Sequence, residues 1–480
     1  MSLYEMTIRG GTIVTADETR LADIGVVGES IVAIEDRLDP GANDVSAKGL
    51  LVFPGGVDSH VHVDQPFSSG AEIADGFASG TASALAGGTT TILSFVMQPR
   101  GGSLRDMAED YHRLAKQSRT DYSFHLTITD PTPSVIEHEL PELVAAGHRS
   151  IKIFMANAST RLTDPQIIVT LAAARKLGAL VCIHAEHHEL IEWLTERLLA
   201  QGKTAPSALA LAKPMIVERE ATQRIITLAE TLDVPIQIFH VSGNDSAEEV
   251  ACAQRRGLKV WAETCSHYLV LTAADLDRPG FEGAKYMFAP APRTKADQEN
   301  LWQRIREGTI TIISSDHSPL KFNHCKGKMF AGENAPFNKV PNGVPGLAAR
   351  LPIVFSEGVA QGRIDAQQFV NLVCAMPARL FGLYPKKGTI AKGSDADIVL
   401  WDPEQRRTLT NAMMQHGSDY TPFEGIVTTG APVSVYLRGR LAFDGKQVLA
   451  EPGNGVFIAR EPYAMIAPNG RFPAGFNPYL

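Results

Sequence analysis

The sequence of 480 residues predicts an α/β fold: a (β/α)8 TIM barrel with a small β-sandwich domain built from both chain ends. Through the middle of the chain, eight short apolar runs alternate with amphipathic helical stretches, whereas both ends are rich in short strands and tight turns. The expected limits are 1–53 and 385–460 for the sandwich, 54–384 for the barrel and 461–480 for a C-terminal arm.

The predicted barrel strands are short apolar runs, and segments with helical periodicity separate most of them, for instance residues 71–88, 164–178 and 247–257. Eight strand–helix units favour a closed barrel over an open sheet. The eight runs are residues 57–62, 89–95, 123–129, 150–155, 180–185, 236–242, 259–265 and 309–316.

The chain ends share a different pattern. MTIRGGTIV and GLLVFPGG near the start, and VSVYLRGRLAFDGKQVLA near the end, read as strands joined by turns. We expect the two ends to pack together, with the barrel inserted between them. The last ~20 residues are rich in Pro and Gly, which is compatible with an extended arm or with a disordered tail.

Composition excludes several classes of protein. The net charge of −8, without a long basic run, argues against a nucleic-acid partner or an anionic membrane. No secretory signal and no run of ~18 apolar residues is present. The five cysteines form no CxxC pair, which favours reduced thiols in a cytoplasmic protein.

Six potential metal ligands lie near the C-terminal ends of the predicted strands. In a closed barrel these ends converge, so the pattern predicts a two-metal hydrolytic site. Nitrogen and oxygen donors without sulfur favour zinc, and manganese or iron stay open. The six residues are His60, His62, Lys152, His184, His240 and Asp316.

His60 and His62 are two residues apart, which on a strand directs both imidazoles to one face. The alternative is a pair of solvated strand histidines. The preceding turn at residues 54–56 and Asp58 favour the first barrel strand as their position.

Lys152 lies in SIKIFM, an otherwise apolar strand on which a charged amine is costly to bury. Reaction of the amine with carbon dioxide would give an anionic carbamate whose two oxygens can bridge two metals. A lysine that extends to the barrel mouth or pairs with a carboxylate is the alternative.

His184 and His240 each follow an apolar run, and Asp316 closes the last one. Each also has an ordinary interpretation: a hydrogen-bonded core histidine, or an aspartate that caps a helix or turn. We prefer His184 over His187 and His188, which fall beyond the strand on the next helix.

The motifs PGGVDSHVHVDQPF, SIKIFMA, CIHAE, FHVSG, SSDHSP and VPNGVPG, in this order, resemble the amidohydrolase superfamily, and within it most closely the hydantoinase/dihydropyrimidinase family. The stretches FVMQPRGGSLRD and DYTPFEG are also similar to that family. The resemblance extends to about Gly445, nearly the whole chain.

This resemblance implies two Zn²⁺ per chain, bridged by carbamylated Lys152. His60, His62 and Asp316 would complete one metal site, and His184 and His240 the other. It also implies hydrolysis of a cyclic amide C–N bond in a hydantoin, dihydropyrimidine or related ring, with Asp316 as the catalytic proton carrier. The implied assembly is a homotetramer or a dimer.

Five further residues are expected to contact the substrate. Asn157 stands where the family usually has a tyrosine that binds the ring, and Ala289 stands where it often has a serine. Asn342 and Ala289 would hold the ring amide through backbone groups, and Phe67 and Met97 would flank the ring substituent.

Other functions stay open. Asp64 occupies the position of an arginine in the dihydroorotase pattern, which argues against that enzyme. An allantoinase and a cyclic imide hydrolase both remain compatible with the sequence. A non-enzymatic, metal-free dihydropyrimidinase-related scaffold is disfavoured, because all six ligand positions are filled.

Overall fold

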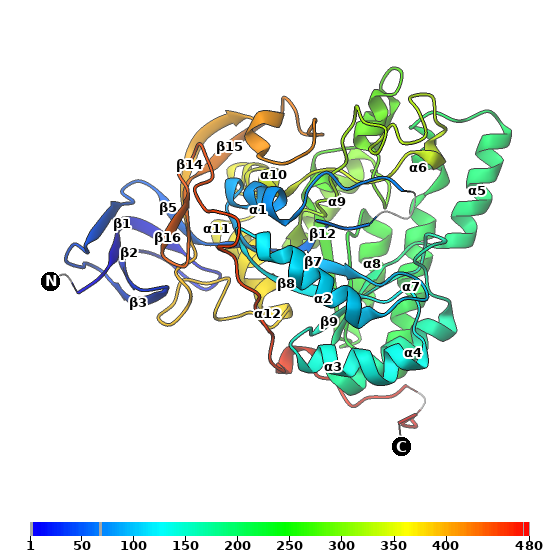
Figure 1. Cartoon of the computed structure of the whole chain (residues 1–480), viewed down its shortest axis with the longest axis horizontal. Helices are drawn as coiled ribbons and strands as arrows, with labels where there is room; N and C mark the ends of the chain where they lie inside the picture. Colours follow the sequence, from blue (N-terminus) through cyan, green and yellow to red (C-terminus); the bar gives the residue numbers. More distant parts are fainter. Residues whose placement is uncertain (1–2, 67–69, 474, 480) are drawn as a thin grey trace.

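The computed structural model describes residues 3–66, 70–473 and 475–479, which form a barrel and a smaller β domain (Figure 1). The barrel strands pair in parallel and in sequence order. They are β6 (Gly56–Val61), β7 (Thr89–Met97), β8 (Asp121–Thr127), β9 (Ser150–Phe154), β10 (Leu180–His184), β11 (Ile236–Ile238), β12 (Val260–Cys265) and β13 (Ile310–Ser314).

The barrel closes just beyond the ends of its first and last strands. Val61 forms a parallel bridge with His317, and the His62 N–H donates to the His317 carbonyl at 2.8 Å. The predicted TIM barrel is therefore confirmed.

Helices follow the strands and cover the outside of the barrel (Figure 1). The sequence specifies their ends locally: in the helix after β9, a Thr163–Gln166 capping box precedes the first turn, and Gly178 ends the helix with a φ of 67°. The α-helices are α1 (Phe77–Ala86), α2 (Leu104–Leu114), α3 (Leu140–Ala145), α4 (Asp164–Leu177), α5 (His188–Ala200), α6 (Ala208–Ala212), α7 (Met215–Leu232), α8 (Asn244–Arg255), α9 (Lys295–Arg306), α10 (Leu347–Val354), α11 (Ala366–Val370) and α12 (Met376–Leu380).

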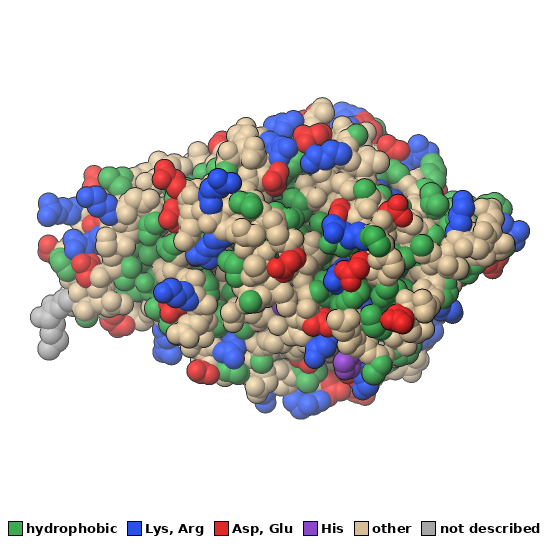
Figure 2. Space-filling view, turned by 90° about the horizontal axis from the view of Figure 1, so that it is seen from above, with side chains coloured by type: hydrophobic (Ala, Val, Ile, Leu, Met, Phe, Trp, Pro, Cys, Tyr) green, Lys and Arg blue, Asp and Glu red, His purple; other side chains and the backbone are tan. Residues whose placement is uncertain are grey.

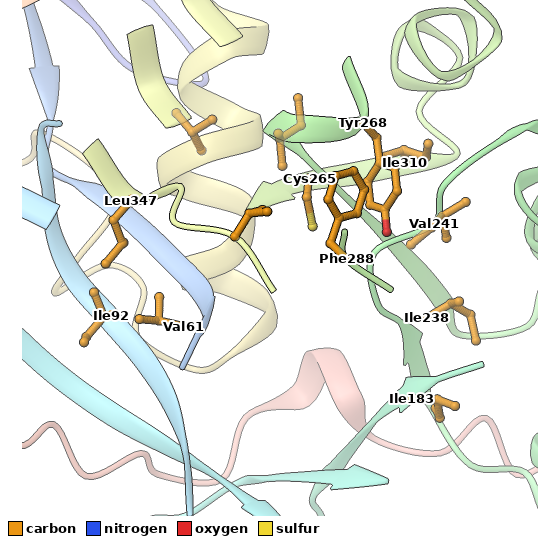
Figure 3. Packing of buried hydrophobic residues seen from close by; sticks show 14 of the residues in the cluster. Val61, Ile92, Ile183, Ile238, Val241, Cys265, Tyr268, Phe288, Ile310 and Leu347 are labelled. Atoms are coloured by element: carbon orange, nitrogen blue, oxygen red, sulfur yellow. The ribbon is translucent and has the colours of Figure 1, made fainter. Parts of the chain in front are cut away.

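The barrel strands are buried on both faces, as continuous apolar strands of a parallel sheet must be. All nine residues of β7 are buried, for example. Core side chains from the strands and from α10 pack into one cluster, and Figure 3 shows Val61, Ile92 and Leu347 close together within it.

Both chain ends contribute to the small domain, as predicted. Its strands form one sheet in the order β16-β15-β14-β5-β1-β2-β3, with β4 beside β1, and they enclose a separate apolar core. N- and C-terminal strands meet where β5 pairs with β14 (Figure 1). The strands are β1 (Met6–Val14), β2 (Thr19–Val27), β3 (Ser30–Glu35), β4 (Asn43–Ser46), β5 (Leu51–Pro54), β14 (Ile398–Thr408), β15 (Val427–Leu437) and β16 (Arg440–Phe443).

The two strands that were expected to contain His240 and Asp316 end before these residues. β11 ends at Ile238 and β13 at Ser314, so His240 and Asp316 lie two residues beyond their strands rather than inside them. At both positions the backbone turns into the left-handed region, with φ of 40° at His240 and 45° at Asp316, which ends the extended conformation.

The segment after the small domain returns to the barrel. Val456 and Ile458 hydrogen-bond with Tyr122 of β8. Arg460 is fully buried and donates to the Phe124 carbonyl, in the middle of β8, and to the hydroxyl of Ser150, the first residue of β9. This segment therefore covers the end of the barrel opposite to the predicted site.

The surface in Figure 2 carries basic and acidic side chains interspersed over the face shown. Among the described residues, no helix combines the length and the apolar composition needed to cross a bilayer.

A buried arginine joins the first and last barrel strands. Arg350 on α10 donates to the carbonyls of Val57 and Ile313, both at 3.1 Å. Its Nε lies 3.2 Å from the Asp58 carboxylate, and both side chains are fully buried. The Arg350–Asp58 ion pair thus spans the seam at which the barrel closes.

We expect Arg350→Leu to destabilise the protein by about 3–5 kcal/mol, because it leaves the Asp58 charge buried without its partner. The midpoint of thermal or urea unfolding measures the loss. Arg363→Leu serves as the control, since its ion pairs with Glu299 and Glu357 lie at the surface and should contribute at most about 1 kcal/mol. Equal shifts for the two variants would contradict the role of Arg350.

Candidate metal centre

The ends of the first and last barrel strands bring three predicted ligands together. The Asp316 carboxylate oxygen Oδ1 lies 3.1 Å from His60 Nε2 and 3.2 Å from His62 Nε2. One donor atom from each of the three residues lies within 4.8 Å of the others, close enough for all three to coordinate one ion.

Two further histidines complete a group of four imidazoles. The rings of His184 and His240 have centroids 4.6 Å apart, and His240 is 5.3 Å from His60. His60 is also 5.3 Å from His62. The predicted convergence of strand ends is therefore present in the structure.

Lys152 lies beside this group, on β9, and is fully buried. Its Nζ has no hydrogen-bond partner within the described part of the chain, and it lies 4.2 Å from the centre of the Phe239 ring, which also packs against His60. Burial lowers the pKa of Lys152 to about 8, although the nearby Asp316 charge opposes this shift. The amine is therefore poorly stabilised as a cation.

Three of the imidazoles are oriented by a neighbouring oxygen. His60 Nδ1 is 2.7 Å from Glu263 Oε1, and His62 Nδ1 is 2.5 Å from the amide oxygen of Gln65. His184 instead uses Nε2, at 2.7 Å from Glu186. Such contacts fix the ring and leave the other nitrogen of each histidine available to a metal.

Sequence reasoning missed these orienting residues. Glu263 could have been recognised, because it is a carboxylate inside the apolar run KVWAETC, just as Lys152 is an amine inside an apolar strand. Burial raises the pKa of Glu263 to about 8. Burial acts in the same direction on Glu186, but the Lys213 ammonium and His184 outweigh it and lower the pKa of Glu186 to about 2.

The electrostatics favour neutral imidazoles. Burial lowers the pKa of His60 and His240 well below the ordinary value, and the neighbouring cationic groups act in the same direction. A neutral imidazole is the form that binds a metal. Neutral nitrogens, a carboxylate and an unpartnered buried amine together fit a divalent metal centre.

The residues predicted to contact the substrate differ from one another in solvent exposure and in hydrogen bonding. Asn157 is exposed, has a φ of 77°, and its side-chain oxygen accepts hydrogen bonds from Ser159. Asn342 is partly buried, and its Oδ1 has no partner in the described residues. Ala289 is partly exposed, Met97 is buried in the barrel core, and Phe67 lies outside the described residues.

Left-handed backbone at non-glycine residues recurs around the site. Besides His240 and Asp316, it occurs at Asn157 and at Asp64, which has a φ of 49°. Such conformations cost free energy and are typical of functional sites. A barrel with a buried histidine, lysine and aspartate group at the C-terminal strand ends defines a metal-dependent barrel enzyme as the class of protein.

Comparison with known proteins is consistent with this class. The family model "Amidohydrolase family" matches residues 51–442. D-hydantoinase from Ralstonia pickettii is 44% identical over 461 residues, which cover 96% of this chain and 99% of the relative. The crystal structure of dihydropyrimidinase from Brevibacillus agri NCHU1002 superposes with a TM-score of 0.93 at 40% identity and covers 96% of this chain and 99% of that one.

L-hydantoinase (dihydropyrimidinase) from Arthrobacter aurescens is more distant, at 28% identity and a TM-score of 0.87 over 95% of this chain and all of that one. The chain belongs to the amidohydrolase superfamily and, within it, to the hydantoinase family. The resemblance found from the sequence motifs is thus confirmed, and the family implies a divalent metal centre.

We expect Glu263→Gln to lower metal affinity by about 10–100-fold, because the carboxyl group that orients His60 is replaced by an amide. Metal retained after dialysis against increasing chelator concentrations measures this affinity. Glu139→Gln is the matched control: that carboxylate is also buried, but it accepts from Ser103 and from the Arg105 backbone on the outside of the barrel. Unchanged retention in Glu263→Gln would contradict the orienting role.

Proposed function

We propose that this protein hydrolyses a ring amide bond in a hydantoin, a dihydropyrimidine or a related cyclic amide. The names of its relatives support this substrate class. The observation that carries the proposal is the position of the Asp316 carboxylate, within 3.2 Å of two histidine nitrogens and near the buried Lys152, whose amine has no hydrogen-bond partner among the described residues.

We propose that the centre holds two zinc ions. His60, His62 and Asp316 would bind one and His184 and His240 the other, with Lys152 shared by both as a carbamate. To form the carbamate, the neutral amine nitrogen bonds to the carbon of CO₂ and loses a proton. The lowered pKa of Lys152 supports this step, because it increases the neutral fraction near pH 7.

When bound, such a centre supplies a hydroxide nucleophile near neutral pH and polarises the amide carbonyl. Asp316 accepts the proton of the nucleophile during attack and then delivers it to the ring nitrogen as the C–N bond breaks. Its place beside His60 and His62 supports this role. The product is a ring-opened carboxylate, such as an N-carbamoyl amino acid.

Substrate contacts would come from the loops at the same end of the barrel. The unpartnered Oδ1 of Asn342 is suited to accept a hydrogen bond from a ring N–H. The backbone at Asn342 and Ala289 would hold the ring amide, and Phe67 and Met97 would flank the ring substituent. Few large apolar groups occur in residues 157–161, which favours a polar or compact substituent.

A second candidate function is hydrolysis of a cyclic imide, such as a succinimide-like ring. Asn157 favours it, because no phenol is present there to stabilise the oxyanion, and hydrogen bonds from Ser159 hold the Asn157 side chain against its own turn. An imide carbonyl is more electrophilic than an amide carbonyl, and so depends less on that donor.

We expect zinc-loaded protein to hydrolyse hydantoins or dihydropyrimidines in a panel that also contains allantoin and cyclic imides. Asp316→Asn should reduce kcat by about 10²–10⁴-fold on the best substrate, since the proton carrier is lost. Metal content must be measured in parallel. Wild-type turnover by a fully zinc-loaded Asp316→Asn protein would refute the proton-transfer role.

We expect Asn157→Tyr to raise kcat/KM on hydantoins relative to cyclic imides, because the phenol supplies an additional donor to the oxyanion. Steady-state kinetics on both substrate classes measure the ratio. Asn157→Phe is the control for ring bulk without the hydroxyl group. If Tyr and Phe variants have the same ratio, position 157 does not act through a hydrogen bond.

A further inference from the structure

A second group of potential metal donors shares Asp316 with the centre described above. Cys265 ends β12, and His267 follows it by two residues. The Cys265 thiol, a ring nitrogen of His267 and a carboxylate oxygen of Asp316 all lie within 4.8 Å of one another. The mechanism proposed above uses neither Cys265 nor His267.

The surroundings of His267 point to a missing ligand. Its side chain is 1% exposed, and within the described residues its ring makes only a weak contact with the Ser315 backbone and no hydrogen bond of normal geometry. The rings of Tyr268 and Phe288 flank it, each with a centroid 4.3 Å away. A single weak contact leaves at least one nitrogen of this buried imidazole unpaired, which is unfavourable, so this position favours a bound partner.

Cys265 is also fully buried and only weakly engaged. Its Sγ lies 3.3 Å from the Ser314 hydroxyl, and Figure 3 shows it next to Phe288 and among apolar side chains. One thiol, one imidazole and one carboxylate are the donor types that zinc accepts, with a position left for water. The harder ions magnesium and calcium prefer all-oxygen sites.

We propose that Cys265, His267 and Asp316 form an additional, inhibitory site for a thiophilic divalent cation such as zinc or cadmium. On binding, the cation forms bonds to sulfur, nitrogen and oxygen, and the thiol proton leaves to solvent. The inhibition rests on the proposed function: Asp316 already lends one carboxylate oxygen to the catalytic centre, and an ion that takes the other oxygen leaves none to accept a proton from the nucleophile. Excess zinc therefore inhibits the enzyme that stoichiometric zinc activates.

The site is tested by titrating cadmium into the zinc-loaded full-length protein. Binding to the thiol should produce a sulfur-to-cadmium charge-transfer band in the ultraviolet, and the chain should take up one additional ion. The band should be absent from Cys265→Ser and weakened in His267→Gln. Cys374→Ser should retain it, because that equally buried thiol donates to the Pro54 carbonyl, away from the site.

Hydrolysis measured in the same titration should fall in the wild-type protein. Cys265→Ser should require more than about ten-fold more cadmium for half-inhibition, since loss of even an outer partner of a metal ligand costs about that much affinity. A charge-transfer band that is as strong in Cys265→Ser as in the wild type, or equal inhibition of the two proteins, would overturn the proposal. A Cys265-dependent band without hydrolysis of any ring would instead count against the proposed function alone.

Discussion

Closure of the barrel is the constraint from which the metal centre follows. His60 lies on the first strand, His62 directly follows it and Asp316 follows the last strand, so these proposed ligands meet only if the two strands are joined. The Asp58 carboxylate accepts hydrogen bonds from the backbone N–H groups of His60 and Ser315, both at 3.2 Å. With Arg350 as its counter-ion, Asp58 links the seam of the barrel directly to the residues that hold the site.

Ionisable groups in the barrel interior cost stability, and the proposed function accounts for their presence. Lys152, Glu263 and Glu186 are all fully buried, and a packed apolar core would avoid the cost of desolvating them. The lowered pKa of Lys152 and the raised pKa of Glu263 show that burial disfavours their charged forms. Functional sites often contain such groups even though burying them lowers the stability of the fold.

The fold and the convergence of the ligands could be predicted from the sequence because both depend on periodic signals. Apolar runs separated by helices indicate the barrel, and a polar residue at the end of such a run faces the open end. Lys152 was recognisable for the same reason: a charge within an apolar strand is anomalous at the level of sequence alone.

Other features depend on three-dimensional contacts that no local pattern encodes. Glu186 engages Nε2 of His184 and so leaves Nδ1 free for a metal. Lys213, which lies between α6 and α7, donates to the same Glu186 carboxylate. The residue types around His240 do not indicate that β11 ends at Ile238 or that His240 adopts a left-handed backbone conformation. Likewise, the sequence shows that Asn157 replaces the tyrosine of the family, but it does not show that Ser159 hydrogen-bonds to the Asn157 side chain.

The pairing of β5 with β14 has a consequence for synthesis of the chain. Pro54 and Ile398 are register partners, 344 residues apart in the sequence. At about 5–20 residues per second, a ribosome needs about 20–70 s to make the intervening chain. During that time the N-terminal strands expose an unsatisfied edge, so nascent-chain protection matters more here than in proteins whose domains are completed in order.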